Sequence, residues 1–288
     1  MPQLASHRHA TGLSGRRVLV TGISGGIGGP TAVELRRRGA TVMGIDLRPS
    51  PPDVLGADVR DAEAMQAAVD TAAERMGGID VLVNCAGVGI AHDAGAFPDA
   101  AARRVLDINL LGTWTATAAA LPHLLRAHGH VVNIASGLAY VTVPFAVAYT
   151  ASKRAVTAYS DTLRMEYRGR IGVSTVYPGY IRTAIHDAPA AQGVSLEGTV
   201  PAEPVHYTVR AILRAIQTGK RDVPTSPGVA VGIFLGRHAP ALLDGAIARR
   251  FERVFRDRAR PAFLRSFDTE TPDALEQPRT APPPAAPH

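Results

Sequence analysis

Apolar and polar positions alternate along the first 226 residues in a way that predicts strands and helices in regular succession. Strands are predicted at residues 17–20, 40–46, 79–84, 130–136 and 171–177. Helices are predicted at residues 30–38, 61–76, 99–126 and 147–168, the third of them interrupted near Pro122. This order is typical of a doubly wound parallel sheet with helices on both faces, an α/β fold in a single domain.

The first predicted strand leads into a glycine-rich turn, Thr21-Gly22-Ile23-Ser24-Gly25-Gly26-Ile27-Gly28, and then into a helix with Pro30 in its first turn. Gly22 permits a tight exit from the strand, Gly26 lets the backbone approach a pyrophosphate, and Gly28 lets the helix lie close to the sheet. Free N–H groups and the helix dipole attract phosphates at this point. The turn therefore predicts a dinucleotide-binding loop of the Rossmann type.

A tyrosine and a lysine, Tyr149 and Lys153, lie four residues apart in a predicted helix and so share one face. An ammonium group beside a phenol favours the phenolate, which suits the tyrosine for proton transfer at neutral pH. Ser136 lies thirteen residues upstream of Tyr149. Taken alone, the pair also fits two residues on a solvated surface. The chain has only two lysines against 29 arginines, so an ammonium at this position favours the catalytic interpretation.

With these motifs in this order, the chain resembles the short-chain dehydrogenase/reductases, in the subgroup with a TGxxxGxG loop and a YxxxK active site. The resemblance extends over about residues 14–226. It implies an oxidoreductase that uses NAD or NADP to interconvert a ketone and a secondary alcohol on a small, apolar molecule, with Tyr149 as general acid and base. It assigns the other catalytic positions to Ser136, which holds the carbonyl oxygen, to Lys153, and to Asn109, which anchors a water linking Lys153 to solvent.

The same resemblance implies a set of residues that contact the cofactor. They are Thr21, Gly22, Ser24, Gly26, Ile27, Gly28, Asp46, Asp58, Val59, Asn84, Ala86, Gly87, Tyr149, Lys153, Pro178, Gly179, Ile181 and Thr183. Asp46 favours NAD(H), because a carboxylate at the end of the second strand accepts ribose hydrogen bonds and repels a 2′-phosphate. Gly25 agrees, since NADP-dependent relatives often carry Arg or Lys there. Arg48 is a contrary signal, so NADP(H) stays open.

The segments outside the core region differ from it in composition. Residues 1–13 are expected to be a mobile leader, residues 184–200 a substrate lid, and residues 268–288 a disordered tail. The proline-rich residues 47–57 predict a loop where many relatives insert a helix.

Residues 227–267 predict an apolar and basic helical extension, with two readings. In the first it packs on the core with its arginines in water. In the second it covers the active-site mouth, selects a bulky apolar substrate and rests its basic face weakly on an anionic membrane.

Composition restricts the cellular compartment and the kinds of partner that we expect for this chain. A single cysteine, Cys85, excludes an internal disulfide, and neither a signal peptide nor a run of about 20 apolar residues is evident, which favours the cytoplasm. The net charge of +6 arises almost entirely between Arg237 and Arg265, and no nucleic-acid motif accompanies it. No metal site is expected, because no carboxylate or cysteine completes a ligand set with His123, His128 and His130. Small residues along two predicted long helices favour a homodimer or homotetramer.

Two other functions remain open at this point. One is a redox-inactive dinucleotide sensor or scaffold on the same fold, which the four catalytic positions argue against. The other is an epimerase or dehydratase of the longer relatives, which the loop spacing and the short substrate region argue against. A fold by itself separates none of these functions.

Overall fold

The computed structural model describes residues 12–50, 52–192, 194 and 200–256. These residues form one seven-stranded sheet in the order β3-β2-β1-β4-β5-β6-β7, and every strand pair is parallel. The strands are β1 Arg17–Thr21, β2 Thr41–Asp46, β3 Val54–Gly56, β4 Val81–Asn84, β5 His130–Ile134, β6 Gly172–Tyr177 and β7 Asp222–Pro224. The predicted doubly wound parallel sheet is confirmed, and its order reverses between β1 and β4, where such folds bind ligands.

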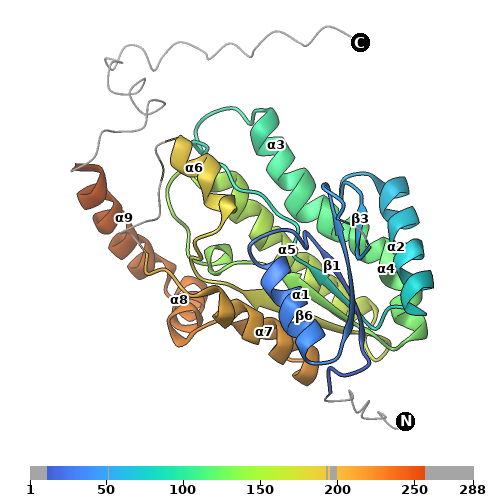
Figure 1. Cartoon of the computed structure of the whole chain (residues 1–288). Helices are drawn as coiled ribbons and strands as arrows, with labels where there is room; N and C mark the ends of the chain where they lie inside the picture. The colour runs from blue at the N-terminus through green and yellow to red at the C-terminus, as the bar shows by residue number, and fades with distance from the viewer. Residues whose placement is uncertain (1–11, 51, 193, 195–199, 257–288) are drawn as a thin grey trace, which may run out of the picture.

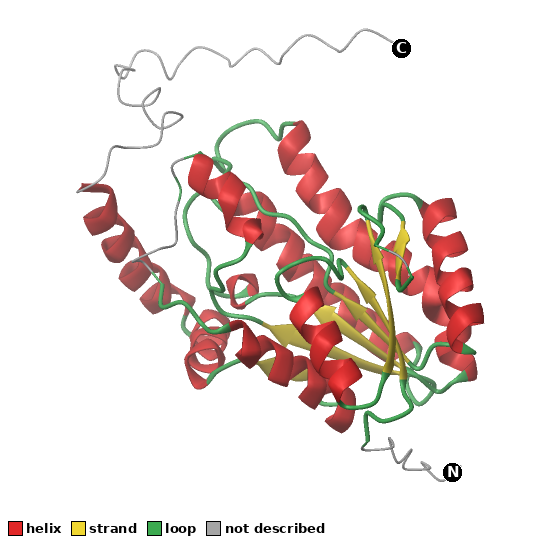
Figure 2. Ribbon diagram, in the orientation of Figure 1, coloured by secondary structure: helices red, strands yellow, loops and turns green. Residues whose placement is uncertain are grey.

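Helices cover both faces of the sheet (Figure 2). One face carries α1 (Gly28–Arg37) and α7 (Val205–Thr218), and the other carries α2 (Ala62–Met76), α4 (Gly112–Arg126) and α5 (Val147–Glu166). The remaining helical segments are α3 Ala100–Leu106, η1 Asp107–Leu111, η2 Gly137–Ala139, η3 Ala184–His186, α6 Asp187–Ala191, α8 Pro227–His238 and α9 Pro240–Arg256. Figure 1 shows α8 and α9 at the opposite side of the molecule from α2.

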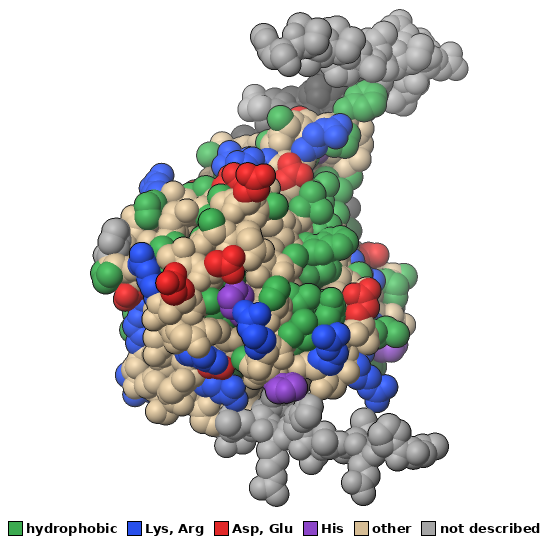
Figure 3. Space-filling model, turned by 90° about the vertical axis from the view of Figure 1, so that its right-hand side faces the viewer, with side chains coloured by type: hydrophobic (Ala, Val, Ile, Leu, Met, Phe, Trp, Pro, Cys, Tyr) green, Lys and Arg blue, Asp and Glu red, His purple; other side chains and the backbone are tan. Residues whose placement is uncertain are grey.

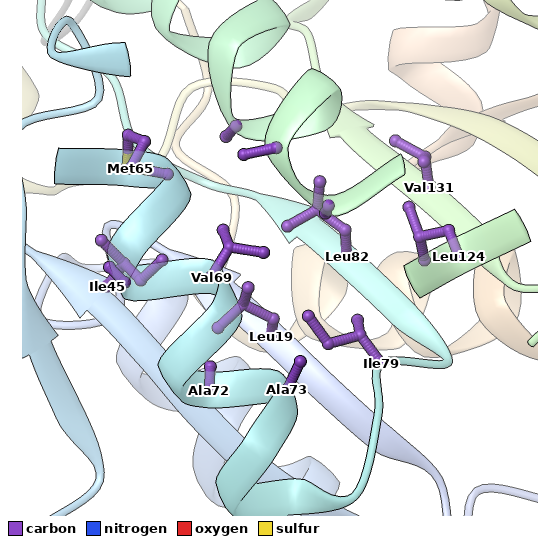
Figure 4. Close-up of a cluster of buried hydrophobic side chains, with 14 of the residues drawn as sticks. Leu19, Ile45, Met65, Val69, Ala72, Ala73, Ile79, Leu82, Leu124 and Val131 are labelled. Carbon is purple, nitrogen blue, oxygen red and sulfur yellow. The ribbon is translucent and has the colours of Figure 1, made fainter. Parts of the chain in front are cut away.

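Alternation along the strands divides the core into two layers. Leu19 and Leu82 point toward α2 and α4, where they meet Met65, Val69 and Leu124 (Figure 4). The intervening positions, such as Val18 and Val83, point toward Leu35 of α1 and Ile212 of α7. A sheet buried on both faces favours apolar residues at successive positions of a strand, and this explains the continuous apolar runs in the sequence.

Helix α2 illustrates how the sequence sets the ends of an element. The Asp61 side chain accepts hydrogen bonds from the backbone N–H groups of Glu63 and Ala64, both at 3.0 Å. Gly77 ends the helix in the left-handed conformation, with φ of 75°. The predicted bounds of this helix differ from the observed ones by one residue, which is its N-cap.

Two local predictions need correction. The long helical region is not interrupted at Pro122, which lies inside α4. Its hydrogen-bonding pattern instead changes from α to π at η1, the turn between α3 and α4. The loop predicted between Asp46 and Asp58 has no helix among its described residues, but it contains β3, which pairs with β2 at the edge of the sheet. The expected leader at residues 1–13 lies largely outside the described residues, and the expected tail at residues 268–288 lies wholly outside them.

Within the described residues, none of the helices combines the length and the apolar composition that a membrane crossing requires. Over the same ranges, no group of three or more His, Cys, Asp and Glu side chains could hold a metal ion.

Candidate active site

Asn109 lies in the π-helical turn η1, and its side chain is fully buried. Its Oδ1 atom accepts a hydrogen bond from the Val88 N–H at 2.8 Å, and its Nδ2 atom donates to the Val88 carbonyl at 3.0 Å and to Ser152 Oγ at 3.0 Å. A π turn places one extra residue in the helix and recurs at functional sites. Here it lets Asn109 fix both the segment after β4 and the part of α5 next to Lys153.

Ser136 follows β5 and caps η2, where its Oγ atom accepts a hydrogen bond from the Leu138 N–H at 3.1 Å. Tyr149 lies in the first turn of α5 and meets the Ser136 hydroxyl. Burial raises the pKa of Tyr149, and the hydrogen bond with Ser136 lowers it by less, so the net direction is upward. The serine and the tyrosine therefore share one hydrogen-bonded site at the carboxyl end of the sheet.

Lys153 is buried one turn after Tyr149, and its Nζ atom donates to the Ile134 carbonyl at 2.9 Å. The same Nζ lies 5.7 Å from the centroid of the Tyr149 ring. The sequence predicted that Lys153 would lower the pKa of Tyr149; instead the pKa is raised, because burial outweighs the other effects. Burial also lowers the pKa of Lys153 to about 8, against a smaller opposing effect of the Cys85 sulfur.

Asn109 and Lys153 meet at Gly87. A Cβ atom at Gly87 would lie 3.3 Å from Asn109 Oδ1 and 3.5 Å from Lys153 Nζ. A side chain there would crowd Asn109 and touch Lys153, and glycine leaves this space free. The structure thus brings the four catalytic positions predicted from the sequence into one cluster.

The glycine-rich turn between β1 and α1 is as compact as the sequence predicted. Gly22 has a positive φ of 64°, and a Cβ atom at Gly28 would lie 2.9 Å from Ile23 Cα. A Cβ at Gly26 would lie 2.9 Å from the Cβ of Thr183, so the turn after β6 lies directly against this loop. The start of α1 and the open backbone at Gly26 form a cradle that fits a pyrophosphate.

Asp46 ends β2 beside this loop. Its Oδ2 atom accepts a hydrogen bond from the Ser24 N–H at 3.0 Å. The carboxylate thus lies at the end of β2, next to the backbone of the glycine loop.

Other predicted cofactor residues have different surroundings. Asn84 is buried on the α4 side of the sheet, where its Nδ2 atom donates to Thr117 Oγ1 at 3.0 Å and to Asn133 Oδ1 at 2.9 Å. The Asp58 carboxylate pairs with Arg60 at 2.6 Å, which lowers the pKa of Asp58. Val59 is packed in the core. The side chains of Asn84 and Val59 are therefore enclosed by other protein groups and are not free to contact a cofactor.

A cavity of about 880 Å³ joins the glycine loop to the catalytic cluster. From the predicted set it is lined by Gly26, Ile27, Gly28, Gly87, Ser136, Tyr149, Lys153, Pro178, Gly179, Ile181 and Thr183. A second pocket of about 490 Å³ adjoins it at Tyr149 and lies under η3 and α6, within the predicted lid. A dinucleotide with its reactive end at Tyr149 fits the larger cavity.

The sequence did not single out Glu203, which also lines the larger cavity. The Glu203 carboxylate accepts hydrogen bonds from Thr225 Oγ1 at 2.5 Å, from the Ser226 hydroxyl and from the Gly179 N–H at 3.2 Å. It therefore ties the Pro178-Gly179 turn to the start of α8. No sequence motif marks it, because its partners lie more than twenty residues away along the chain.

Comparison with known proteins agrees with this geometry. The family described as short chain dehydrogenase matches residues 16–192. The D-threitol dehydrogenase of Mycolicibacterium smegmatis is 32% identical over 252 residues, which cover 81% of this chain and 90% of that protein. The dehydrogenase/reductase SDR family protein 7-like of Anopheles gambiae is 28% identical over 281 residues, covering 88% of this chain and 89% of that protein.

Solved structures agree as well. A short chain dehydrogenase from Burkholderia cenocepacia J2315, in complex with NADP, superposes with a TM-score of 0.71 at 26% identity, covering 82% of this chain and 99% of that one. The family match spans more than half of the sequence and includes the glycine loop and all four positions of the catalytic cluster. The chain therefore belongs to the short-chain dehydrogenase/reductase family, and it is an oxidoreductase that binds a nicotinamide dinucleotide.

Proposed function

We propose that the enzyme interconverts a ketone and a secondary alcohol on a largely apolar small molecule. The observation that carries this proposal is the position of Ser136, Tyr149 and Lys153 together on the wall of one cavity that continues to the glycine loop. The lining beyond these groups is mainly aliphatic and includes Ile90, Leu138, Val141, Val143 and Ile185. Such a lining favours a substrate with an apolar body.

In the direction of reduction, the Ser136 hydroxyl donates a hydrogen bond to the carbonyl oxygen and stabilises the charge that develops on it. The nicotinamide, when bound, supplies the hydride that reaches the carbonyl carbon. Tyr149 gives its phenolic proton to the same oxygen, and Lys153 stabilises the phenolate that remains. Asn109 holds the segment around Val88 and a water through which Lys153 exchanges protons with solvent. Oxidation of the alcohol uses the same groups in reverse.

A screen tests the reaction. The full chain is incubated with NADH or NADPH and a set of ketones, and with NAD or NADP and the matching secondary alcohols, and cofactor absorbance is followed. Turnover of any pair excludes the redox-inactive sensor. Inversion at a carbon without net oxidation of the substrate would instead favour the epimerase.

For the cofactor, we expect tighter binding of NADH than of NADPH, because the Asp46 carboxylate beside Ser24 repels a 2′-phosphate. Asp46→Ala is expected to reduce this preference about tenfold, which corresponds to about 1.4 kcal/mol. The ratio of the two dissociation constants, measured by cofactor fluorescence, checks this. Asp53→Ala is the matched control, since it removes an exposed carboxylate that pairs with Arg36. Tighter binding of NADPH to the wild type would contradict the expectation and point to Arg48.

For assembly, we propose that two copies pair through α4 and α5. Figure 3 shows exposed apolar side chains gathered on one face of the molecule. The exposed apolar residues of the segment from α3 to α5 include Leu106, Leu111, Trp114 and Val147. The centroid of the Trp114 ring lies 5.3 Å from that of the Tyr159 ring. Contiguous exposed apolar surface of this kind marks an interaction site.

Trp114→Arg is therefore expected to convert a dimer or tetramer into smaller species, because it places a charge in the middle of this surface. Sedimentation velocity at micromolar concentration measures the change. Phe234→Arg is the control, since Phe234 is 61% exposed on α8, away from the proposed interface. A wild type that sediments only as a monomer would refute the pairing.

A further inference from the structure

Helix α9 forms part of the wall of the larger cavity. Ile247, Arg250 and Phe251 line it together with Ser136, Tyr149 and Glu203. Their spacing of three and four residues puts them on one face of the helix. Phe251 is only 4% exposed. The sequence left two interpretations of the C-terminal extension, packing on the core and covering the active-site mouth. The position of these three residues favours the second, in which the helix forms part of the active-site wall.

Helix α8 packs against α9 and is itself tied to the segment after β5. The Tyr140 ring lies between the guanidinium groups of Arg154 and Arg237, at 4.3 and 4.2 Å from the ring centroid. Arg237 also donates a hydrogen bond to the Tyr140 hydroxyl at 2.7 Å, and Arg154 donates to the Ala139 carbonyl at 2.8 Å. Such stacked cation–aromatic contacts are stabilising. They fasten α8 to η2, the segment that Ser136 caps.

Most of the charged groups around the cavity are already engaged. Lys153 donates to the Ile134 carbonyl, and the Glu203 carboxylate is held by Thr225, Ser226 and Gly179. The His186 ring packs on Tyr180 with 4.7 Å between the ring centroids, and burial lowers the pKa of His186, so it is uncharged at neutral pH.

Arg104 also lines the cavity, and its charge adds to the Arg60 hydrogen bond in lowering the pKa of Asp58. The Arg250 guanidinium differs from these groups. Among the described residues it has neither a hydrogen bond nor an ion pair. Arg250 is exposed, so its guanidinium presents a cation to ligands and to solvent at the wall of a mainly apolar cavity.

We infer that the substrate carries a carboxylate that Arg250 binds, in addition to its apolar body and its carbonyl or hydroxyl group. A guanidinium matches a carboxylate with two parallel hydrogen bonds, a planar two-point recognition that an ammonium group does not offer. The substrate class is thus a keto acid or hydroxy acid with an apolar chain or ring between the two polar groups. The carbonyl or hydroxyl group of this substrate rests on the proposed ketone–alcohol reaction. The contact between the carboxylate and Arg250 does not depend on that reaction.

The test compares alkyl and aryl keto acids of increasing length with their methyl esters. For a substrate long enough to span Tyr149 and Arg250, the wild type is expected to prefer the acid. Arg250→Leu is expected to raise KM for the acid about three- to fivefold, the upper range for a solvent-exposed ion pair, with kcat little changed and the ester unaffected. Arg249→Leu, one residue earlier and outside the cavity lining, is the matched control, and Arg250→Lys should recover part of the loss.

A binding measurement separates this inference from the proposed reaction. Titration calorimetry of the full chain with decanoate and with decanol should show tighter binding of decanoate that Arg250→Leu removes and Arg249→Leu retains. If that holds while no carbonyl compound is turned over, the carboxylate site stands and the reaction falls. Equal use of acids and esters by all variants would overturn the site while leaving the reaction intact. A change confined to KM for the cofactor in Arg250→Leu would also overturn it, because Arg250 would then bind the pyrophosphate.

Discussion

Tyr149→Phe is expected to lower turnover at least about a hundredfold, the usual contribution of a positioned general acid and base, while cofactor affinity stays nearly unchanged. The substitution removes only the hydroxyl that meets Ser136 and leaves the ring on the cavity wall. Initial rates with a substrate found in the ketone screen, together with dissociation constants for the cofactor, measure the two effects separately.

Tyr159→Phe is the matched control, because Tyr159 lies on the same helix and packs on Trp114 outside the site. It should keep the wild-type rate. If Tyr149→Phe retained more than about a tenth of the turnover, another group would be the acid, and the role assigned to Tyr149 would be wrong.

Much of the site could be predicted because parallel sheets restrict where chain segments meet. The carboxyl ends of parallel strands lie along one edge, so the turns after β1, β5 and β6 must converge once the strand order is known. The contact of Gly26 with Thr183 is an instance, since the two residues are far apart in sequence and adjacent in space. The side chain of Asn84 follows the alternation along β4: it points to the face that also receives Leu82, where it donates to Thr117.

Features that depend on tertiary contacts could not be predicted. The π turn at Asp107–Leu111 places Asn109 against Val88 and Ser152, and no local pattern distinguishes it from a continuous helix. The three-residue strand β3 exists only through its pairing with β2, since its own sequence is short and follows prolines. The rise in the pKa of Tyr149 likewise reflects burial, which the four-residue spacing to Lys153 does not encode.

Lys153→Met is expected to lower turnover and to weaken cofactor binding together, in contrast with Tyr149→Phe. The Lys153 Nζ atom lies 5.7 Å from the centroid of the Tyr149 ring and donates to the Ile134 carbonyl, on the wall of the cavity that the cofactor would occupy. Lys220→Met is the control, because it removes the only other lysine, at an exposed position. A Lys153→Met enzyme with unchanged cofactor affinity would limit Lys153 to the proton-transfer step.

The two lysines also allow a direct measurement of the charge at the site. With 13C at the lysine ε-carbon, the free enzyme should give two resonances, and the one missing in Lys153→Met should titrate with a midpoint of about 8, because burial destabilises the ammonium.

The unfolded chain then binds more protons than the folded one between about pH 8 and 10.5, so the contribution of Lys153 to stability becomes more favourable as the pH rises through that range. The free energy of unfolding of the wild type, compared with that of Lys153→Met at several pH values, should show this slope. A midpoint near 10 for Lys153, or the same pH dependence in both proteins, would mean that the ammonium is solvated and that burial does not set its charge.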